Sequence, residues 1–160
     1  GGQHGSFLSP SMYRDLIKPF HQRLFSAARE LAPNAHIMMH SDGSVFDLLD
    51  DLIDAGMDVL EAVQVECARM DPALLKETFG DRLSFHGAIS VQQLLPKADE
   101  EGVRRACRNL VDTLGERGGY IAAPSHAIQI GTPVKNVLAM LQTVLGDDDY
   151  RAAWETSRIA

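Results

Sequence analysis

Cysteine is scarce in this chain, which has only Cys67 and Cys107 among its 160 residues. They lie far apart, one after an apolar run and the other inside a helical pattern. We therefore expect free, buried thiols in a reducing cytoplasm rather than a disulfide framework. The chain also lacks an apolar run close to the roughly 20 residues of a membrane span, and its first residues do not form a secretory signal. The sequence thus predicts a cytoplasmic protein without a membrane partner.

The chain also has fewer basic than acidic residues. Lys and Arg number 15 against 22 Asp and Glu, which gives a formal net charge of -7. The densest basic group, Arg104, Arg105 and Arg108, is spaced as one solvated face of a helix. Because binding to phosphates requires clustered basic residues, nucleic acid is excluded as the main partner.

What remains is an ordinary globular composition, 45% hydrophobic and 23% charged. We expect one domain over residues 1–160, since a chain of this length buries roughly 70% of its unfolded surface. Hydrophobic spacing alternates between the helical and the strand period. It predicts helices over 10–32, 44–55, 71–79, 99–117 and 132–145, and short apolar strands over 35–40, 58–64, 82–86 and 120–123.

Helix boundaries have their own signals. Pro19 should kink the first helix, Gly56 should end the second, and Asp71 should cap the third, with Pro72 in its first turn. Strands joined by helices must be parallel. Four strand–helix units are half of an eight-stranded (β/α)8 TIM barrel, and a small open four-stranded α/β sheet is the alternative. Both folds place function after the carboxyl ends of the strands.

Polar residues gather at those strand ends. They include three of the six histidines, and in chain order the segments are His40-Ser41-Asp42-Gly43, Gln64, His86-Gly87 and Ser125-His126. His40 and Asp42 are two apart and point to the same side of an extended chain. With His126 they form a set of two imidazoles and one carboxylate, which suits Zn²⁺ or another divalent metal such as Fe²⁺. The alternative is that Asp42 caps the following helix and His40 hydrogen-bonds to it. Glu61 and Gln64 have opposite strand parity, so at most one of them should face the barrel interior.

Five blocks in order resemble the C-terminal half of the uroporphyrinogen decarboxylase family, whose superfamily includes cobamide-dependent methyltransferases. The blocks are GGQHGSFLSP with MYRDLIKPF, MMHSDGSVFDLLDDLIDAGMDVLEAVQ, LKETFGDRLSFHGAIS and GGYIAAPSHAIQIGTPVKNVLAML, and they span nearly the whole chain. The resemblance implies a β/α barrel, of which residues 1–160 would form strands five to eight. The N-terminal half of the barrel would be absent.

The two branches of this superfamily imply different chemistry. In the methyltransferases, an H-x-C motif and a later cysteine hold a zinc that activates a thiol to accept a methyl group from a corrinoid protein. His40 matches that histidine, while Asp42 and His126 stand at the two cysteine positions. The decarboxylases use no metal, and His126 matches a histidine that contacts the porphyrinogen. Their substrate-binding arginines belong to the absent half, and their pattern Q-G-N-x-D-P is replaced by residues 85–90, FHGAIS.

The resemblance leads to these expectations. The parent activity is decarboxylation of a tetrapyrrole or related carboxylate, with metal-dependent methyl transfer and an inactive barrel fragment as alternatives. Whether the chain alone is an active enzyme stays open. His126 and His86 are the expected catalytic residues, and Gln64 and Ser125 the expected contacts of a small-molecule substrate. Half a barrel has two unpaired edge strands, so a homodimer is expected.

Overall fold

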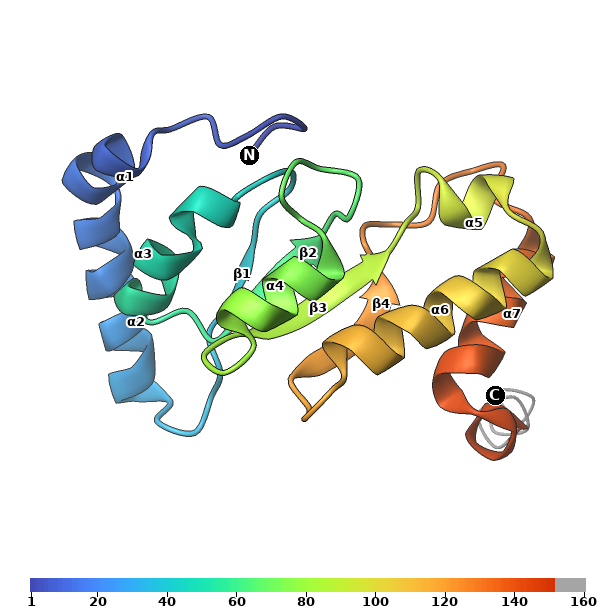
Figure 1. Ribbon diagram of the computed structural model, residues 1–160. Coiled ribbons are helices and arrows are strands. Elements are labelled where there is room, and N and C mark those ends of the chain that lie inside the picture. The colour runs from blue at the N-terminus through green and yellow to red at the C-terminus, as the bar shows by residue number, and fades with distance from the viewer. Residues whose placement is uncertain (152–160) are drawn as a thin grey trace.

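The four strands expected from the sequence form one sheet in the computed structural model, which describes residues 1–151. All neighbouring strands are parallel, and their order in the sheet follows the chain. The strands are β1 Met38–His40, β2 Val59–Val63, β3 Ser84–Ile89 and β4 Tyr120–Pro124. Every crossover between successive strands contains a helix, as parallel pairing requires (Figure 1).

Local sequence signals set several helix boundaries. The helices are α1 Pro10–Leu16, α2 Lys18–Leu31, the 3₁₀ helix η1 Phe46–Leu48, α3 Leu49–Ala55, α4 Pro72–Phe79, α5 Leu94–Lys97, α6 Glu100–Leu114 and α7 Val134–Leu145. Asp71 caps α4 by accepting the Leu74 amide at 3.0 Å. Gly56 ends α3 at a φ of 111°, a conformation that glycine adopts readily. Both boundaries confirm the prediction. Within the described residues, none of these helices has the length and apolarity that a membrane span needs.

The first expected helix is divided in two. α1 ends at Leu16 and α2 begins at Lys18, with Ile17 between them. Pro19 has no N–H to donate to the carbonyl of Asp15, so a continuous helix would lose a hydrogen bond at this point. The irregularity predicted at Pro19 is therefore present, as an interruption of the helix at Ile17.

Several other boundaries differ from the prediction, such as β1, which begins at Met38 rather than residue 35, and α6, which ends at Leu114 rather than residue 117. β3 continues to Ile89 instead of ending at His86, because its last residues pair with β4, Gly87 with Ala122 and Ile89 with Pro124. The sequence does not predict these last residues of β3, because Gly87 interrupts the apolar pattern. The short helix α5 was also not expected.

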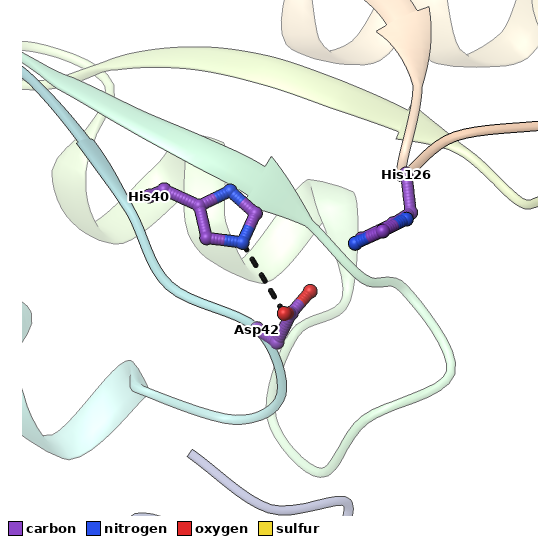
Figure 2. Close-up of side chains that lie close together, drawn as sticks. All are labelled: His40, Asp42 and His126. Atoms are coloured by element: carbon purple, nitrogen blue, oxygen red, sulfur yellow. Dashed lines mark hydrogen bonds and ion pairs between the residues drawn. The ribbon is translucent and has the colours of Figure 1, made fainter.

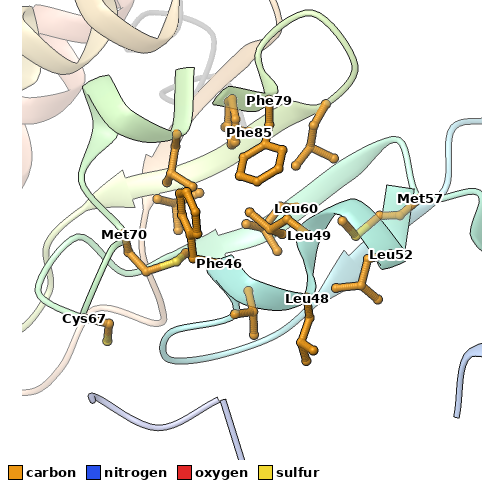
Figure 3. Close-up of a cluster of buried hydrophobic side chains, with 14 of the residues drawn as sticks. Phe46, Leu48, Leu49, Leu52, Met57, Leu60, Cys67, Met70, Phe79 and Phe85 are labelled. Atoms are coloured by element: carbon orange, nitrogen blue, oxygen red, sulfur yellow. The ribbon is translucent and has the colours of Figure 1, made fainter. Parts of the chain in front are cut away.

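The main core lies between the sheet and the helices that cover one of its faces (Figure 3). Phe85 of β3 and Leu60 of β2 are completely buried there, against Leu49 of α3 and Phe79 of α4. A second cluster joins the end of β3 to α6 and α7 through Ile89, Leu95, Val103, Cys107 and Met140. Cys67 and Cys107 are both free and buried, as the sequence predicted.

The other face of the sheet is open. Met38 of β1 is 47% exposed and Ile121 of β4 is 48% exposed. On the flank beside β1, Phe20 and Leu24 of α2 are also exposed. Parallel sheets are normally covered on both faces. Within residues 1–151, β1 and β4 each pair on one side only. The described part of the chain therefore presents apolar surface beside both edge strands of its sheet.

We expect the 160-residue chain to self-associate through these edges, because unpaired strands and exposed apolar side chains favour pairing with another copy. Light scattering after size exclusion should give a mass above 17.5 kDa that falls on dilution. Changing both Phe20 and Leu24 to Asp should shift the chain toward monomer, because it places charge on an exposed apolar surface. Both side chains are exposed, so the fold itself should be retained. A wild-type chain that stays monomeric at every concentration would contradict this expectation.

Candidate metal centre

The site is built at the carboxyl end of β1. His40 is the last residue of that strand, and Asp42 follows two positions later in the loop. Their side chains meet as the spacing predicted, with His40 Nε2 3.2 Å from Asp42 Oδ2 (Figure 2). Asp42 caps no helix, since the side-chain caps of η1 and α3 are empty. The contact between His40 and Asp42 was expected, whereas the capping role for Asp42 is wrong.

The neighbouring strand β2 supplies a second partner for His40. Glu61 is the register partner of His40, and its Oε2 lies 2.6 Å from His40 Nδ1. A carboxylate oxygen only accepts, so Nδ1 carries a proton and donates it to Glu61. This hydrogen bond to Glu61, helped by Asp42, raises the pKa of the His40 imidazole above its ordinary value of 6.5.

His126 reaches the same place from the other edge strand. It follows β4 by two residues, and its ring centroid is 6.1 Å from that of His40, with the rings tilted by 69°. One ligand atom each from His40, Asp42 and His126 lies within 4.8 Å of the others. Figure 2 shows the His126 ring directed toward the pair formed by His40 and Asp42. The fold thus brings together three side chains that are separated by up to 86 positions in sequence.

The spacing can be compared with that of a metal centre. Two ligand atoms on a tetrahedral zinc lie roughly 3.3 Å apart, as follows from bonds of about 2.0–2.1 Å. The separation of 3.2 Å between His40 Nε2 and Asp42 Oδ2 is already of that size. His126 Nδ1 accepts the Ala127 amide at 2.8 Å, so Nε2 is the nitrogen that this ring can offer to a shared ion. The three ligand atoms lie within 4.8 Å of one another, and the exposed side chains would move closer together around an ion.

The other predicted site residues lie outside this cluster. Gln64 follows β2, and its Oε1 accepts the Gly43 amide at 2.7 Å. Ser125 is 1% exposed, and its hydroxyl accepts the Val91 amide at 3.4 Å. His86 lies inside β3 rather than at its end, and its Nδ1 is buried with no hydrogen-bond partner among residues 1–151. The structure does not bring His86 into the group of His40, Asp42 and His126.

Glu61 is the residue that sequence reasoning passed over. Strand parity predicted that at most one of Glu61 and Gln64 faces the barrel interior, yet Glu61 contacts His40 at the end of β1 and Gln64 contacts Gly43 in the loop that follows. Gln64 lies beyond the last residue of β2, so strand alternation does not apply to it. The register between β1 and β2 would have identified Glu61, but local sequence does not specify that register.

Similarity to known proteins covers most of the chain. Residues 3–146 match the family model described as Uroporphyrinogen decarboxylase (URO-D). The uroporphyrinogen decarboxylase of Crocosphaera subtropica is 26% identical over 147 residues, which are 91% of this chain and 39% of that protein. The uroporphyrinogen decarboxylase of Thermus thermophilus is 29% identical over 137 residues, 86% of this chain and 37% of that protein.

One solved structure matches about the same share of this chain as these relatives do. A methyltransferase from Methanosarcina mazei superposes with a TM-score of 0.67 at 24% identity, over 86% of this chain and 37% of that one. At this identity the likeness shows the fold, and it confirms four consecutive strand–helix units of a β/α barrel. The chain spans less than two fifths of the length of each of these relatives.

Proposed function

This chain belongs to the uroporphyrinogen decarboxylase family, and on that premise we propose that its reaction site is a divalent-metal centre used in methyl transfer. His40, Asp42 and His126 are the proposed ligands. The observation that carries the proposal is their convergence within 4.8 Å at one edge of a parallel sheet. That edge is where α/β folds place their reacting groups.

The donor set fits a divalent ion. Two imidazoles and a carboxylate suit Zn²⁺ or Fe²⁺ and leave positions for a substrate. Neither Cys67 nor Cys107 belongs to the cluster, so the ligands are harder than a thiolate set. Glu61 completes the arrangement of a carboxylate behind a metal-binding histidine, since it holds His40 Nδ1 and directs Nε2 toward Asp42.

Each residue has a defined task in this proposal. Glu61 fixes the tautomer and the ring orientation of His40. Asp42 contributes the negative charge that a divalent cation needs, and His126 closes the site from β4. A bound metal would supply Lewis acidity that lowers the pKa of a small thiol and makes it a methyl acceptor. We place the methyl donor on a corrinoid protein, as the resemblance to the cobamide-dependent methyltransferases implies.

Decarboxylation is the second candidate, because the curated relatives described above are both named uroporphyrinogen decarboxylase. Loss of CO₂ leaves an electron pair on carbon, which then takes up a proton. His126 is exposed at the strand edge and is the candidate proton donor. His86, whose Nδ1 has no partner among residues 1–151, is the candidate group for contacting substrate from within the sheet. Ser125 stays a predicted substrate contact in both candidates, and Gln64 stays one in the decarboxylase.

Metal content tests the first candidate without relying on turnover, which matters for a chain of this length. The purified wild-type chain should contain stoichiometric zinc or iron by mass spectrometry after metal-supplemented growth. His126→Ala should lose it, because two remaining ligands do not hold the ion. His36→Ala removes an exposed imidazole that precedes β1, at the opposite end of the strand from His40, and should keep the metal. A metal-free wild-type chain that turns over a porphyrinogen carboxylate would favour the decarboxylase instead.

A further inference from the structure

The loop that carries Asp42 is held at three backbone amides by two segments, the end of β2 with the residue after it and the segment at Gly2. The Ser41 amide donates to the Glu61 carbonyl at 2.5 Å, and the Ser44 amide donates to the Gly2 carbonyl at 2.8 Å. Between them, the Gly43 amide donates to the side-chain Oε1 of Gln64 at 2.7 Å. The amide directly after Asp42 is therefore fixed by a side chain, whereas its neighbours are fixed by backbone.

Gly43 lies between two restraints, of which the bond to Gln64 is one. Its φ is 77°, and a Cβ at this position would lie 2.4 Å from the Gly1 carbonyl oxygen and 2.8 Å from that of Gly2. The backbone is thus pressed against the segment at residues 1–2 on one side and tied to Gln64 on the other. Asp42 itself is half exposed, and its carboxylate contacts His40 alone among the described residues. The direction of that carboxylate is consequently set by the backbone on either side of it.

The surroundings of Gln64 hold its side chain in position to accept the Gly43 amide. It immediately follows β2, whose pairing with β1 also sets Glu61 beside His40. The thiol of Cys67, which is 8% exposed, lies 4.0 Å from the same Oε1. The acceptor oxygen is therefore held in position before any ligand arrives, which is the condition for an outer residue to orient a ligand.

We propose that Gln64 is a positioning residue that fixes Asp42 for metal binding through the Gly43 amide, rather than a contact of the substrate. The inference rests on the proposed metal centre. Loss of the Gln64 oxygen leaves a buried amide unsatisfied and frees the loop, so the carboxylate must be ordered again when metal binds. An outer-shell residue of this kind changes metal affinity by about 10- to 100-fold.

The experiment compares Gln64→Ala, which removes the acceptor, with Gln64→Glu, which keeps an oxygen at the same distance. Gln22→Ala, on an exposed face of α2, is the matched control. Zinc affinity is measured by competition with a chromophoric chelator. We expect about a 10- to 100-fold loss in Gln64→Ala, and affinity close to wild type in Gln64→Glu and Gln22→Ala. Exchange of the Gly43 amide, followed by NMR in metal-free protein, should speed up in Gln64→Ala only.

The outcomes separate this inference from the function on which it rests. A wild-type chain that binds no zinc overturns the proposed metal centre, and the positioning role with it. Zinc affinity that is unchanged in Gln64→Ala overturns the positioning role alone. Equal losses in Gln64→Ala and Gln64→Glu also overturn it, because the positioning role depends on the acceptor oxygen. The Co²⁺ absorption spectrum adds a signature, since Gln64→Ala should shift toward the spectrum of Asp42→Ala.

Discussion

Replacing His40 with alanine is expected to weaken zinc binding by more than about 100-fold, the upper range for loss of an outer-shell partner alone. His40 touches both carboxylates of the site, Glu61 through Nδ1 and Asp42 through Nε2. Its removal therefore deletes one ligand and leaves Glu61 without its partner. Chelator competition at a fixed pH measures the change, with His36→Ala as the control for a lost exposed imidazole.

Glu61→Gln is a milder change whose effect on zinc affinity can be compared with that of His40→Ala. The amide oxygen can still accept from His40 Nδ1, but the negative charge that strengthens this bond is gone. We expect a loss of about 10- to 100-fold in zinc affinity, smaller than that of His40→Ala. If His40→Ala binds zinc as tightly as the wild-type chain, the metal centre is not where we place it.

The same contacts give zinc affinity a pH dependence. In the metal-free chain the hydrogen bond to Glu61 raises the pKa of His40, and the proton on Nε2 faces Asp42. An ion that binds Nε2 must displace that proton. Affinity should therefore rise with pH through the raised pKa of His40, beyond the ordinary value of 6.5. In Glu61→Gln this rise should move to lower pH, which a titration series can measure.

The second large effect concerns stability. Asp51 of α3 is 5% exposed and joins α3 to the N-terminal helices. Its carboxylate accepts from Arg14 Nε at 2.8 and 2.9 Å and from Lys18 Nζ at 2.8 Å. Asp51→Ala would leave the Lys18 ammonium, whose side chain is only 17% exposed, without its nearest partner. We expect a loss of about 2–3 kcal/mol in unfolding free energy, somewhat below the cost of breaking a fully enclosed pair.

Urea unfolding followed by circular dichroism measures this loss. The control is Asp54→Ala, since Asp54 lies 3.5 Å from Lys18 but its side chain is 62% exposed. Asp54→Ala should lower the free energy of unfolding by less than about 1 kcal/mol. Equal costs for the two variants would show that burial of the Asp51 carboxylate is not what gives this contact its strength.

The contribution of the Asp51 contacts to stability should also depend on pH. The hydrogen bond from Arg14, followed by the contacts with Lys18, lowers the pKa of Asp51 below its ordinary 3.8. A carboxyl with a depressed folded pKa stabilises the fold above its unfolded pKa, and this contribution disappears as pH falls through the folded value. The stability difference between wild type and Asp51→Ala should therefore be full at neutral pH. It should shrink below about pH 3.8.

Much of the fold could be predicted because its signals are local. The alternation of strand and helix periods gave all four strands, and Asp71 and Gly56 gave two helix ends that the structure confirms. The convergence of His40, Asp42 and His126 also followed from local signals. Parallel strands deliver their carboxyl ends to one edge of the sheet, so placing each histidine after a strand was sufficient.

The extent of β3 could not be predicted, because Gly87 breaks the apolar pattern while pairing with β4 continues the strand. His86 was consequently placed at the strand end, although it lies within the strand. The role of Glu61 was also hidden. Its contact with His40 joins residues 21 positions apart on different strands, and only the register between β1 and β2 sets them side by side.

The sequence by itself determined the parallel α/β order, the helix caps and the identity of the three candidate ligands, because each depends on neighbouring residues. Only the tertiary structure decided which carboxylate orients His40, which amide fixes the loop of Asp42 and which face of the sheet stays open. Those features depend on which residues of separate segments are paired across strands or packed together, and the pattern of one segment does not identify its partners in another.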